Sequence, residues 1–380
     1  MLSFLGANET LRFDSVRLKN FLSFRDAELS FGEFTALIGL NASGKSNFVT
    51  AMKLLREIPT FGLPTSIARR GGFDQMRHRS GGRPFDPSIE IRFQIGTQPI
   101  SSYSLALKSV RGKRYEVKRE SATVYWAGDH HSFTSDGVTV LYDTNGRSDE
   151  FRVPVLPGQS ALGVGGGLAV FVIFSVLKSI QTVELNTSKM REIQEPSSTQ
   201  DFEPDGSNAA SVYELLSPSE RSQLADELAT IVPTVARIDV EALTDRQTLT
   251  FAQRTPTGTR EFSARQMSDG TLRAFGILLA AGQKSQPSML VVEEPETAIH
   301  MGAMKTLTEL LLGKTETMQI VVTTHSAEIV DFLPTESLRV VRSKSGESTI
   351  SPVAEHTKGL IAAELARPGE LLRLNALDGR

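Results

Sequence analysis

The pattern of hydrophobic and polar positions divides the chain into three blocks. Up to about residue 155, short alternating segments such as 89–95 (IEIRFQI) and 103–110 (YSLALKSV) are separated by Gly, Pro and Asp clusters, which is typical of β-strands joined by turns. Residues 289–292 (MLVV) and 320–322 (IVV) are continuous apolar runs that alternate with helical patterns. Such runs predict buried parallel strands covered by helices on both faces.

The middle block, about 156–262, has a different character. It contains the polar stretch 194–208 (QEPSSTQDFEPDGSN) and then a helix start in which Ser217, Pro218 and Glu220 form a capping-box pattern. We therefore expect a helical insertion that divides one domain into an N-terminal lobe, residues 1–155, and a C-terminal lobe, residues 263–380.

Composition and charge describe an ordinary globular chain. Its 380 residues are 39% hydrophobic and 22% charged, and a net charge of -3 gives no overall nucleic-acid signature. The absence of cysteine excludes disulfides and thiolate metal sites. The start of the chain lacks the features of a signal peptide, and the apolar run 168–177 is about half the length of a membrane span. We expect this run to be a buried helix or strand, and the protein to be soluble and cytoplasmic, with no membrane partner.

The segment 39–47 (GLNASGKSN) matches the phosphate-loop pattern GxxxxGK[ST]. It follows the apolar run 34–38 and precedes a helical pattern in which Phe48, Met52 and Leu55 share one face. Strand, loop and helix therefore come in the order that phosphate binding requires.

The residue types of this loop explain the chemistry. Glycines let backbone N–H groups turn toward phosphate oxygens, and the start of the following helix adds its positive dipole end. Lys45 supplies a charge for the β- and γ-phosphates, and Ser46 offers a hydroxyl to Mg²⁺. The candidate nucleotide-binding residues are Gly39, Asn41, Ala42, Ser43, Gly44, Lys45, Ser46 and Asn47.

Three further signals lie in the last block. Ser268 and Gly270 (in QMSDGT) precede a helical pattern, Glu293 and Glu294 follow the run MLVV, and His325 follows the run IVV. Each has a plain alternative: a helix N-cap, solvated acids and a structural histidine. The carboxyl ends of parallel strands, however, are where open α/β sheets bind ligands.

In this order the motifs resemble those of ABC-type ATPases. GLNASGKSN, MSDGT, LVVEEPE and TTHS resemble the Walker A, signature, Walker B and switch-histidine motifs. The opening RLKNFLSFRDAELSF resembles the RecF and SMC-like branch. EEPETAIH with TTHS is similar to the stand-alone and OLD-type predicted ATPases, and FEPDGSNAASVYELL resembles a stretch in the helical insert of those ATPases. The resemblance implies an α/β P-loop NTPase fold: an ABC ATPase head with a mainly parallel central sheet, an N-terminal antiparallel β lobe and a helical insertion.

The resemblance also implies roles for individual residues, with ATP and Mg²⁺ as the bound groups. Lys45 and its loop would hold the triphosphate, and Ser46 and Glu293 would hold Mg²⁺. Glu294 would orient or deprotonate the attacking water, and His325 would contact the γ-phosphate.

A second subunit would complete the site, because Ser268 and Gly270 would approach the γ-phosphate from a partner chain. The resemblance thus implies a homodimer, or a higher assembly of dimers, formed through the ATP sites.

Several positions depart from the pattern of the family. Ala42 occupies a position that is often Gly, Glu293 stands where most ABC proteins have Asp, and His300 replaces an aspartate. Gln75 and Gln94 are both candidates for the metal-sensing glutamine.

The biological role is less specified than the chemistry. The family favours DNA repair or antiphage defence with a nuclease or toxin partner; the alternative is a slow ATP-dependent switch that holds such a partner without acting on DNA. Basic residues in 108–119 and 69–79 are compatible with DNA contact and equally with protection of an exposed hairpin edge. The segment after Ser326 shows no convincing pair of acids for a metal site, so we expect no nuclease activity in this chain.

Overall fold

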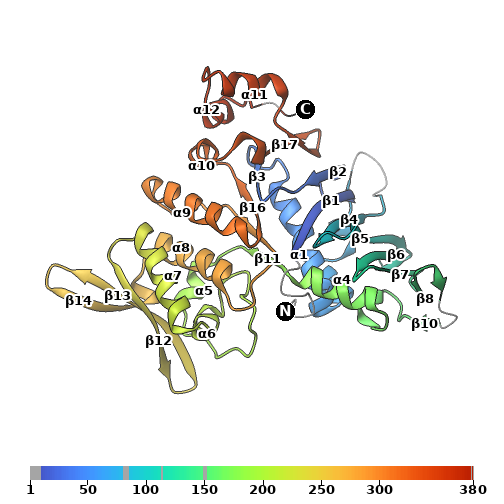
Figure 1. Cartoon of the computed structure of the whole chain (residues 1–380), viewed down its shortest axis with the longest axis horizontal. Coiled ribbons are helices and arrows are strands. Elements are labelled where there is room, and N and C mark those ends of the chain that lie inside the picture. The colour runs from blue at the N-terminus through green and yellow to red at the C-terminus, as the bar shows by residue number, and fades with distance from the viewer. Residues whose placement is uncertain (1–9, 80–84, 113, 149–151, 378, 380) are drawn as a thin grey trace.

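The computed structural model describes residues 10–79, 85–112, 114–148, 152–377 and 379. Within these residues the strands form three sheets: a nine-stranded sheet, a six-stranded sheet and a three-stranded sheet. The nine-stranded sheet lies on one side of the molecule and the three-stranded sheet on the other, with the six-stranded sheet between them (Figure 1).

The N-terminal block forms the nine-stranded antiparallel sheet, as the alternating pattern predicts. Its order is β10-β8-β7-β6-β5-β4-β1-β2, with β9 beside β8. Alternate side chains are buried along strands such as β4, because one face of the sheet shares a hydrophobic core with the helices α1 and α4. The strands are β1 (Leu11–Phe21), β2 (Phe24–Ser30), β4 (Ser88–Ile95), β5 (Ser101–Val110), β6 (Arg114–Trp126), β7 (Asp129–Ser135), β8 (Thr139–Thr144), β9 (Arg147–Ser148) and β10 (Val153–Pro154).

The six-stranded central sheet has the order β11-β15-β16-β3-β17-β18. Its first five strands are parallel to their neighbours, and only β18 is antiparallel. The predicted fold class, with a mainly parallel central sheet and an antiparallel N-terminal β lobe, is therefore confirmed. The strands are β3 (Phe34–Ile38), β11 (Ile180–Val183), β15 (Met289–Glu293), β16 (Gln319–Thr324), β17 (Leu338–Lys344) and β18 (Glu347–Pro352).

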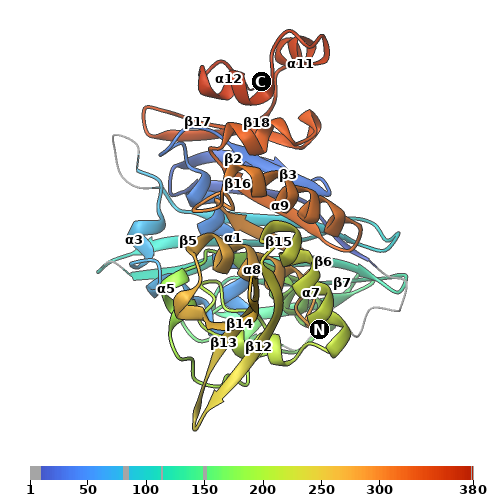
Figure 2. The ribbon, with the colours of Figure 1, turned by 90° about the vertical axis from the view of Figure 1, so that its left-hand side faces the viewer.

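The continuous apolar runs arise because the central sheet separates two hydrophobic cores. Along β15, Met289 and Val291 pack in the core that contains α1, whereas Leu290 and Val292 pack in the core that contains α8 and α9. Both faces of the strand are thus buried in hydrophobic cores, so its sequence does not alternate between apolar and polar residues. The helices α7, α8 and α9 lie together on one side of this sheet (Figures 1 and 2).

The helices complete the two cores and the end of the chain. The C-terminal helices α11 and α12 lie beyond β17 and β18 (Figure 2). The helices are α1 (Lys45–Phe61), α2 (Leu63–Ala68), α3 (Phe73–Met76), α4 (Leu168–Lys178), α5 (Thr187–Arg191), α6 (Ala209–Glu214), α7 (Pro218–Ile231), α8 (Asp269–Gly282), α9 (Met301–Gly313), α10 (Ala327–Asp331), α11 (Glu355–Ala362) and α12 (Pro368–Arg373).

The middle block, 156–262, contains the expected helices and also strands that we did not predict. The capping box of α7 is present: Ser217 accepts from the backbone of Glu220, whose side chain accepts from the backbone of Ser217. Strand β11 joins the central sheet, and β12 (Val235–Leu243), β13 (Arg246–Thr255) and β14 (Gly258–Ser263) form the three-stranded sheet. The block is therefore mixed, and its limits as a unit stay a prediction.

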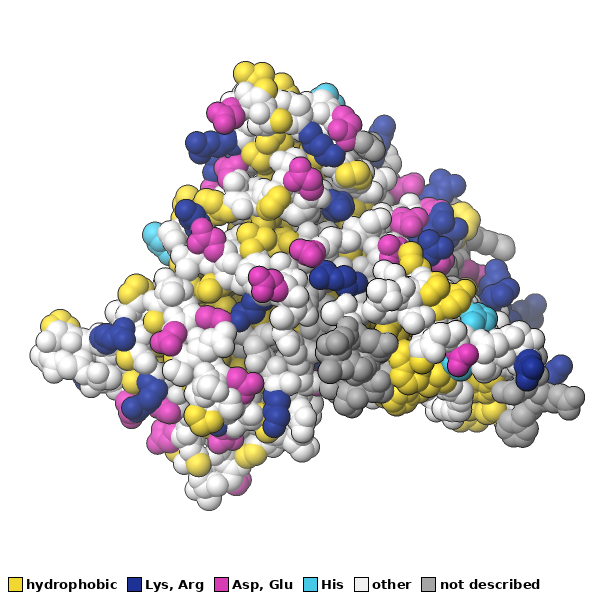
Figure 3. All heavy atoms as spheres, in the orientation of Figure 1, with side chains coloured by type: hydrophobic (Ala, Val, Ile, Leu, Met, Phe, Trp, Pro, Cys, Tyr) yellow, Lys and Arg dark blue, Asp and Glu magenta, His cyan; other side chains and the backbone are white. Residues whose placement is uncertain are grey.

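The apolar run 168–177 forms the helix α4. Among the described residues, no helix is long and apolar enough to cross a membrane. The space-filling view shows hydrophobic side chains gathered at lower right, over the region of α4 and β8 (Figure 3).

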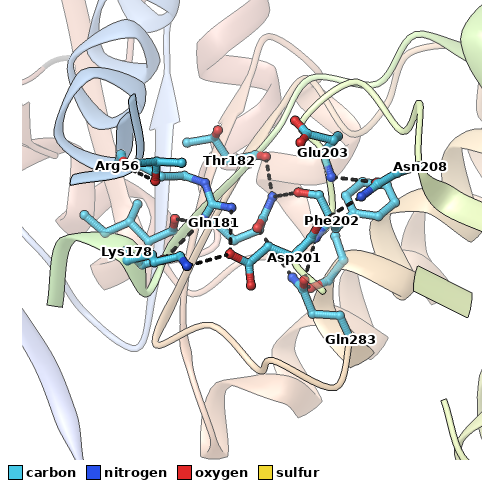
Figure 4. Close-up of polar contacts among 12 residues, drawn as sticks. Arg56, Lys178, Gln181, Thr182, Asp201, Phe202, Glu203, Asn208 and Gln283 are labelled. Carbon is cyan, nitrogen blue, oxygen red and sulfur yellow. Dashed lines mark hydrogen bonds and ion pairs between the residues drawn. The ribbon is translucent and has the colours of Figure 1, made fainter. Parts of the chain in front are cut away.

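The polar stretch 194–208 is anchored by a buried network between α1, β11 and α8 (Figure 4). Arg56 of α1, whose side chain is 14% exposed, donates to the carbonyls of Lys178 and Ile180 at 3.0 and 2.7 Å. Its guanidinium also lies 3.8 Å from the Asp201 carboxylate. Part of this polar stretch, including Phe202 and Asn208, is therefore buried in the interior of the fold.

Gln283, the residue after α8, is expected to contribute measurably to stability. Its Oε1 accepts from the Phe202 backbone N–H at 2.7 Å, and its side chain is buried. Gln283→Ala leaves that buried N–H without a partner, so we expect the free energy of unfolding in urea to fall by about 1–3 kcal/mol. Gln286→Ala is the matched control, because Gln286 is exposed and its amide donates to the Thr317 hydroxyl at the surface; its effect should stay within about 0.5 kcal/mol. Equal stabilities of the two variants would contradict this role.

Candidate functional site

The phosphate loop connects β3 to α1 at the carboxyl edge of the central sheet. A cavity of about 520 Å³ is lined by the loop residues Asn41–Asn47 together with Glu294 and His325. Residues far apart in the sequence thus meet where the strands β3, β15 and β16 end.

Lys45 is buried within the loop. Its Nζ donates to the carbonyls of Gly39 and Leu40 at 2.8 and 2.9 Å. Burial lowers the pKa of Lys45, and the negative charges of Glu294, Glu296 and Glu293 oppose that shift. The ammonium group is therefore held in place by two neutral acceptors, with the acidic end of β15 nearby.

The loop backbone explains two of its small residues. Ala42 has φ 60°, in the left-handed region that favours glycine, which is consistent with Gly being common at this position in the family. Gly44 has φ 115°, and a Cβ there would lie 2.4 Å from the Ser348 Oγ. Ser348 in turn donates to the Ser43 carbonyl at 2.6 Å, so β18 supports the loop from outside.

Gly39 is the first residue of the phosphate loop and lies next to β17. A Cβ at this position would lie 2.3 Å from the Val341 carbonyl oxygen of β17, so no side chain fits. Here the loop also lines a second cavity of about 230 Å³, with the end of β17 and residues of the C-terminal segment such as Leu372.

Glu294 and His325 lie side by side above the ends of β15 and β16. Glu294 has φ 44°, an unusual backbone conformation for glutamate that is often found at functional sites. Its backbone N–H donates to the Thr323 carbonyl at 3.0 Å, which extends the strand pairing by one residue. The His325 Nδ1 lies 3.3 Å from the Glu294 Oε1, so the two side chains can act together on a group in the cavity.

The expected metal ligands are Ser46 and Glu293. Ser46 lines the cavity, and Glu293 is the half-buried last residue of β15. A hydroxyl and a carboxylate are suitable oxygen ligands for Mg²⁺, which keeps several waters and binds few protein groups. The described residues contain no cluster of three or more His, Asp or Glu that could hold a metal by itself. The donor set fits Mg²⁺ held largely by phosphate and water, and the assignment stays a prediction.

Ser268 and Gly270 lie at the start of α8 and do not line the phosphate-loop cavity. Ser268 is the N-cap of α8: its Oγ accepts from the Thr271 N–H at 3.2 Å. A Cβ on Gly270 would lie 2.5 Å from the Ala298 carbonyl oxygen, so this glycine lets the loop after β15 pack on the helix. The capping role is thus present, and contact of these two residues with nucleotide stays a prediction.

Three comparisons place the chain among known proteins. Residues 174–331 match the family described as "AAA domain, putative AbiEii toxin, Type IV TA system". The SMC head bound to the C-winged helix domain of ScpA superposes with a TM-score of 0.55 at 13% identity, over 91% of this chain and 99% of that one. The SMC head with an extended coiled coil, bound to the C-terminal domain of ScpA derived from Pyrococcus furiosus, gives 0.55 at 12% identity, over 94% and 100%. No curated protein matches the sequence.

The chain has the fold of an SMC-type ABC ATPase head. The resemblance to the RecF and SMC-like branch of ABC-type ATPases is therefore confirmed at the level of the fold. The more specific likeness to OLD-type proteins stays a prediction.

The segment around Asp269, which resembles an ABC signature, is held by a cluster that sequence reasoning missed. Asp269 Oδ1 accepts from the Thr187 hydroxyl at 2.6 Å and from Arg191 at 2.5 Å. Arg191 also donates to the Met267 carbonyl at 2.8 Å. These hydrogen bonds hold the pKa of Asp269 below its usual value. The helix α5 thus holds the segment around Asp269 in place. Because α5 lies far from this segment in the sequence, no local pattern indicated the contact.

Two further charged residues at the site were not predicted. Arg273, one turn into the signature helix α8, donates to the Glu294 carbonyl at 3.4 Å. Glu296 accepts from the backbone N–H of the switch histidine at 3.0 Å. Glu296 is part of the EEPE motif in the sequence, and Arg273 lies four residues after Asp269, on the same face of the helix. Neither pattern indicated which residue Glu296 or Arg273 would contact.

The remaining sequence candidates lie away from the Walker A cavity. Gln75 belongs to α3, and Gln94 on β4 donates to the Gln98 carbonyl at 2.7 Å; neither lines the cavity. His300 is the N-cap of α9, and its Nδ1 accepts from the Gly302 N–H at 3.1 Å. A metal-sensing glutamine is therefore not placed by the described geometry.

The basic segment 108–119 forms the tip of the β5–β6 hairpin, with Lys113 outside the described residues. Among the described residues, the pairing of β6 with β7 begins at Glu120. Lys108 pairs with Glu116 at 3.0 Å, and in 69–79 Arg70 pairs with Glu57 at 2.7 Å. Basic and acidic side chains are interspersed on the face in Figure 3. Edge protection and DNA contact both stay open as interpretations.

Proposed function

We propose that this ABC ATPase head binds and hydrolyses ATP as a nucleotide-gated dimer, in DNA repair or antiphage defence in the cytoplasm, with a partner effector. The observation that carries this proposal is the cavity in which the Walker A loop meets Glu294 and His325 while Ser268 and Gly270 remain outside. A site with only half of the expected motifs favours completion by a second chain.

Each residue of the cavity has a chemical role in this proposal. Lys45 and the loop amides bind the triphosphate, and Ser46 and Glu293 hold Mg²⁺, which neutralises developing phosphate charge. Glu294 orients or deprotonates the attacking water. His325 contacts the γ-phosphate and responds to its loss.

The partner chain supplies Ser268 and Gly270 at the start of α8, where free backbone N–H groups and the helix dipole favour an anion. A twofold homodimer, or a higher assembly of such dimers, satisfies both sites. The SMC heads to which the fold is similar are bound to ScpA domains, which supports a separate partner protein for this chain.

Lys45→Ala tests the nucleotide site. Loss of a charge-assisted contact costs about 1.5–3 kcal/mol, so the Kd for ATP should rise by about one to two orders of magnitude. Isothermal titration calorimetry measures this directly. Lys53→Ala is the matched control on the same helix, because Lys53 pairs with Glu184 and lies outside the cavity. Wild-type ATP affinity in the Lys45→Ala protein would exclude this assignment.

A second candidate function is a slow ATP-dependent switch that holds a toxin or nuclease partner without acting on DNA. The family description, which names a toxin and a toxin–antitoxin system, favours it. ATP turnover that rises with added DNA supports the first function. A protein that co-purifies with the chain and dissociates on ATP hydrolysis supports the second.

A further inference from the structure

Glu296 is an enclosed carboxylate beside the phosphate-loop cavity to which the four motifs give no role. It follows the Walker B strand β15 and Pro295, and its side chain is 10% exposed. The neighbouring Glu294 side chain is 37% exposed. A carboxylate this enclosed is retained only where donors compensate for its lost hydration.

The donors come from the residues that follow β16. Glu296 Oε1 accepts from the Thr324 hydroxyl at 2.7 Å and from the His325 backbone N–H at 3.0 Å. The Thr324 Oγ1 in turn accepts from the Ser326 N–H at 3.0 Å. Through this chain of bonds, one carboxylate fixes the turn that carries the switch histidine.

The same oxygen also faces the histidine ring. The His325 Nδ1 lies 3.3 Å from the Glu296 Oε1 and 3.3 Å from the Glu294 Oε1. Carboxylate oxygens are acceptors for an N–H, so a proton on Nδ1 is the arrangement in which the ring can pair with these two oxygens. The Nε2 is then the ring nitrogen left for a group in the cavity, because the bond made by one nitrogen sets the state of the other.

The two carboxylates differ in how firmly they are held. The Glu294 side chain is more exposed and lines the cavity, whereas the Glu296 side chain is fixed by the donors at residues 324 and 325. A side chain that must accept from an attacking water has to be free to turn toward it. The other side chain must then keep the ring in place.

We propose that Glu296 is a positioning residue that holds the His325 backbone and ring Nδ1, so that Glu294 stays free to turn toward water. This role rests on the proposed ATPase function. In this role Glu296 is a fixed acceptor beside Glu294 and His325. The tautomer of His325 is then set by Glu296 and not by the bound nucleotide.

The second oxygen of Glu296 points to the same role. Within the described part of the chain, Oε2 is buried and has no hydrogen-bond partner. It can therefore accept a further donor, such as the Nδ1–H of a shifted ring or a water, with no existing contact to break. Glu296 can thus follow a small movement of the histidine on nucleotide binding.

The first test uses the tautomer of His325 in the full chain without nucleotide. Long-range ¹H–¹⁵N spectra of ¹⁵N-histidine-labelled protein, assigned with His325→Gln, should show the Nδ1-protonated form in the wild type. Glu296→Ala should give a mixture of tautomers, and Glu296→Gln an intermediate result, since a neutral amide oxygen accepts more weakly than a carboxylate. Glu328→Gln is the matched control, because Glu328 contacts Ser326 and Arg373 and not the ring.

The second test separates turnover from binding. Misplacing a reacting group can cost about 10²-fold in rate, so kcat for ATP hydrolysis should fall by about 10- to 100-fold in Glu296→Ala. The Kd for ATP should change by less than about threefold, since the phosphate loop is untouched. Glu296→Gln should recover most of the rate, and Glu328→Gln should match the wild type.

Wild-type tautomer populations and wild-type kcat in both Glu296 variants would overturn the proposal. If Glu296→Ala does not fold, Glu296→Gln is the deciding variant. An unchanged His325 spectrum in Glu296→Gln would then contradict the positioning role. If the wild type hydrolyses no ATP, the proposed function fails, while the spectrum of His325 still decides what Glu296 holds.

Discussion

Glu294→Gln is expected to slow ATP hydrolysis by about two to four orders of magnitude, the usual contribution of a positioned general base. The side chain lines the phosphate-loop cavity from a residue with φ 44°, next to His325. An amide of the same size keeps the shape of the cavity but cannot take a proton from water. Binding of ATP should therefore persist, because Lys45 and the loop amides are unchanged.

Single-turnover hydrolysis and ATP titration measure the two parts of this expectation. Glu309→Gln is a suitable control, since Glu309 lies on α9, is solvent-exposed and pairs with Lys305. A normal rate in Glu294→Gln would remove the residue from the role of base. Loss of ATP binding in Glu294→Gln would instead indicate that the carboxylate holds the nucleotide or its metal.

The same variant should accumulate a nucleotide-bound dimer. A ligand that binds only the paired state stabilises that state by mass action, and hydrolysis removes the support. With ATP and Mg²⁺, Glu294→Gln protein should therefore sediment as a dimer or a higher assembly of dimers.

The sequence predicted the central sheet well because its strands are buried on both faces. The runs MLVV and IVV could not alternate with polar residues, and they became β15 and β16 of the central sheet. The phosphate loop was equally visible, because its motif lies within eight consecutive residues between a strand and a helix. Patterns that follow from local geometry can be read from sequence.

Contacts between distant segments could not be predicted in the same way. The Ser348 that supports the Walker A loop lies 305 residues from Ser43, and Arg191, which holds Asp269, is 78 residues from it. The strands β12–β14 were missed because the middle block was interpreted from its strongest local signal, the capping box at Ser217. Glu296 belonged to a motif that we quoted, but only the fold shows that its side chain turns toward the end of β16.

Ser268→Arg is expected to abolish ATP hydrolysis while leaving ATP affinity nearly unchanged. Ser268 is exposed and does not line the phosphate-loop cavity of its own chain, so an arginine there costs its own monomer little beyond the N-cap, about 1 kcal/mol. In a head-to-tail dimer the same side chain would enter the partner's nucleotide site and block closure. Ser219→Arg, at an exposed position of α7, is the matched control for charge and size.

Mixing Ser268→Arg chains with Lys45→Ala chains makes this expectation sharper. Neither homodimer contains an intact site, but each heterodimer has one, formed by the Lys45 of one chain and the Ser268 of the other. Random pairing of equal amounts should restore about a quarter of the wild-type rate if the two sites act independently, and less if hydrolysis requires both sites together. ATP turnover measured across a range of protein concentrations decides the underlying point, because a composite site needs association. A monomer that hydrolyses ATP with a specific rate independent of its own concentration would refute the composite site.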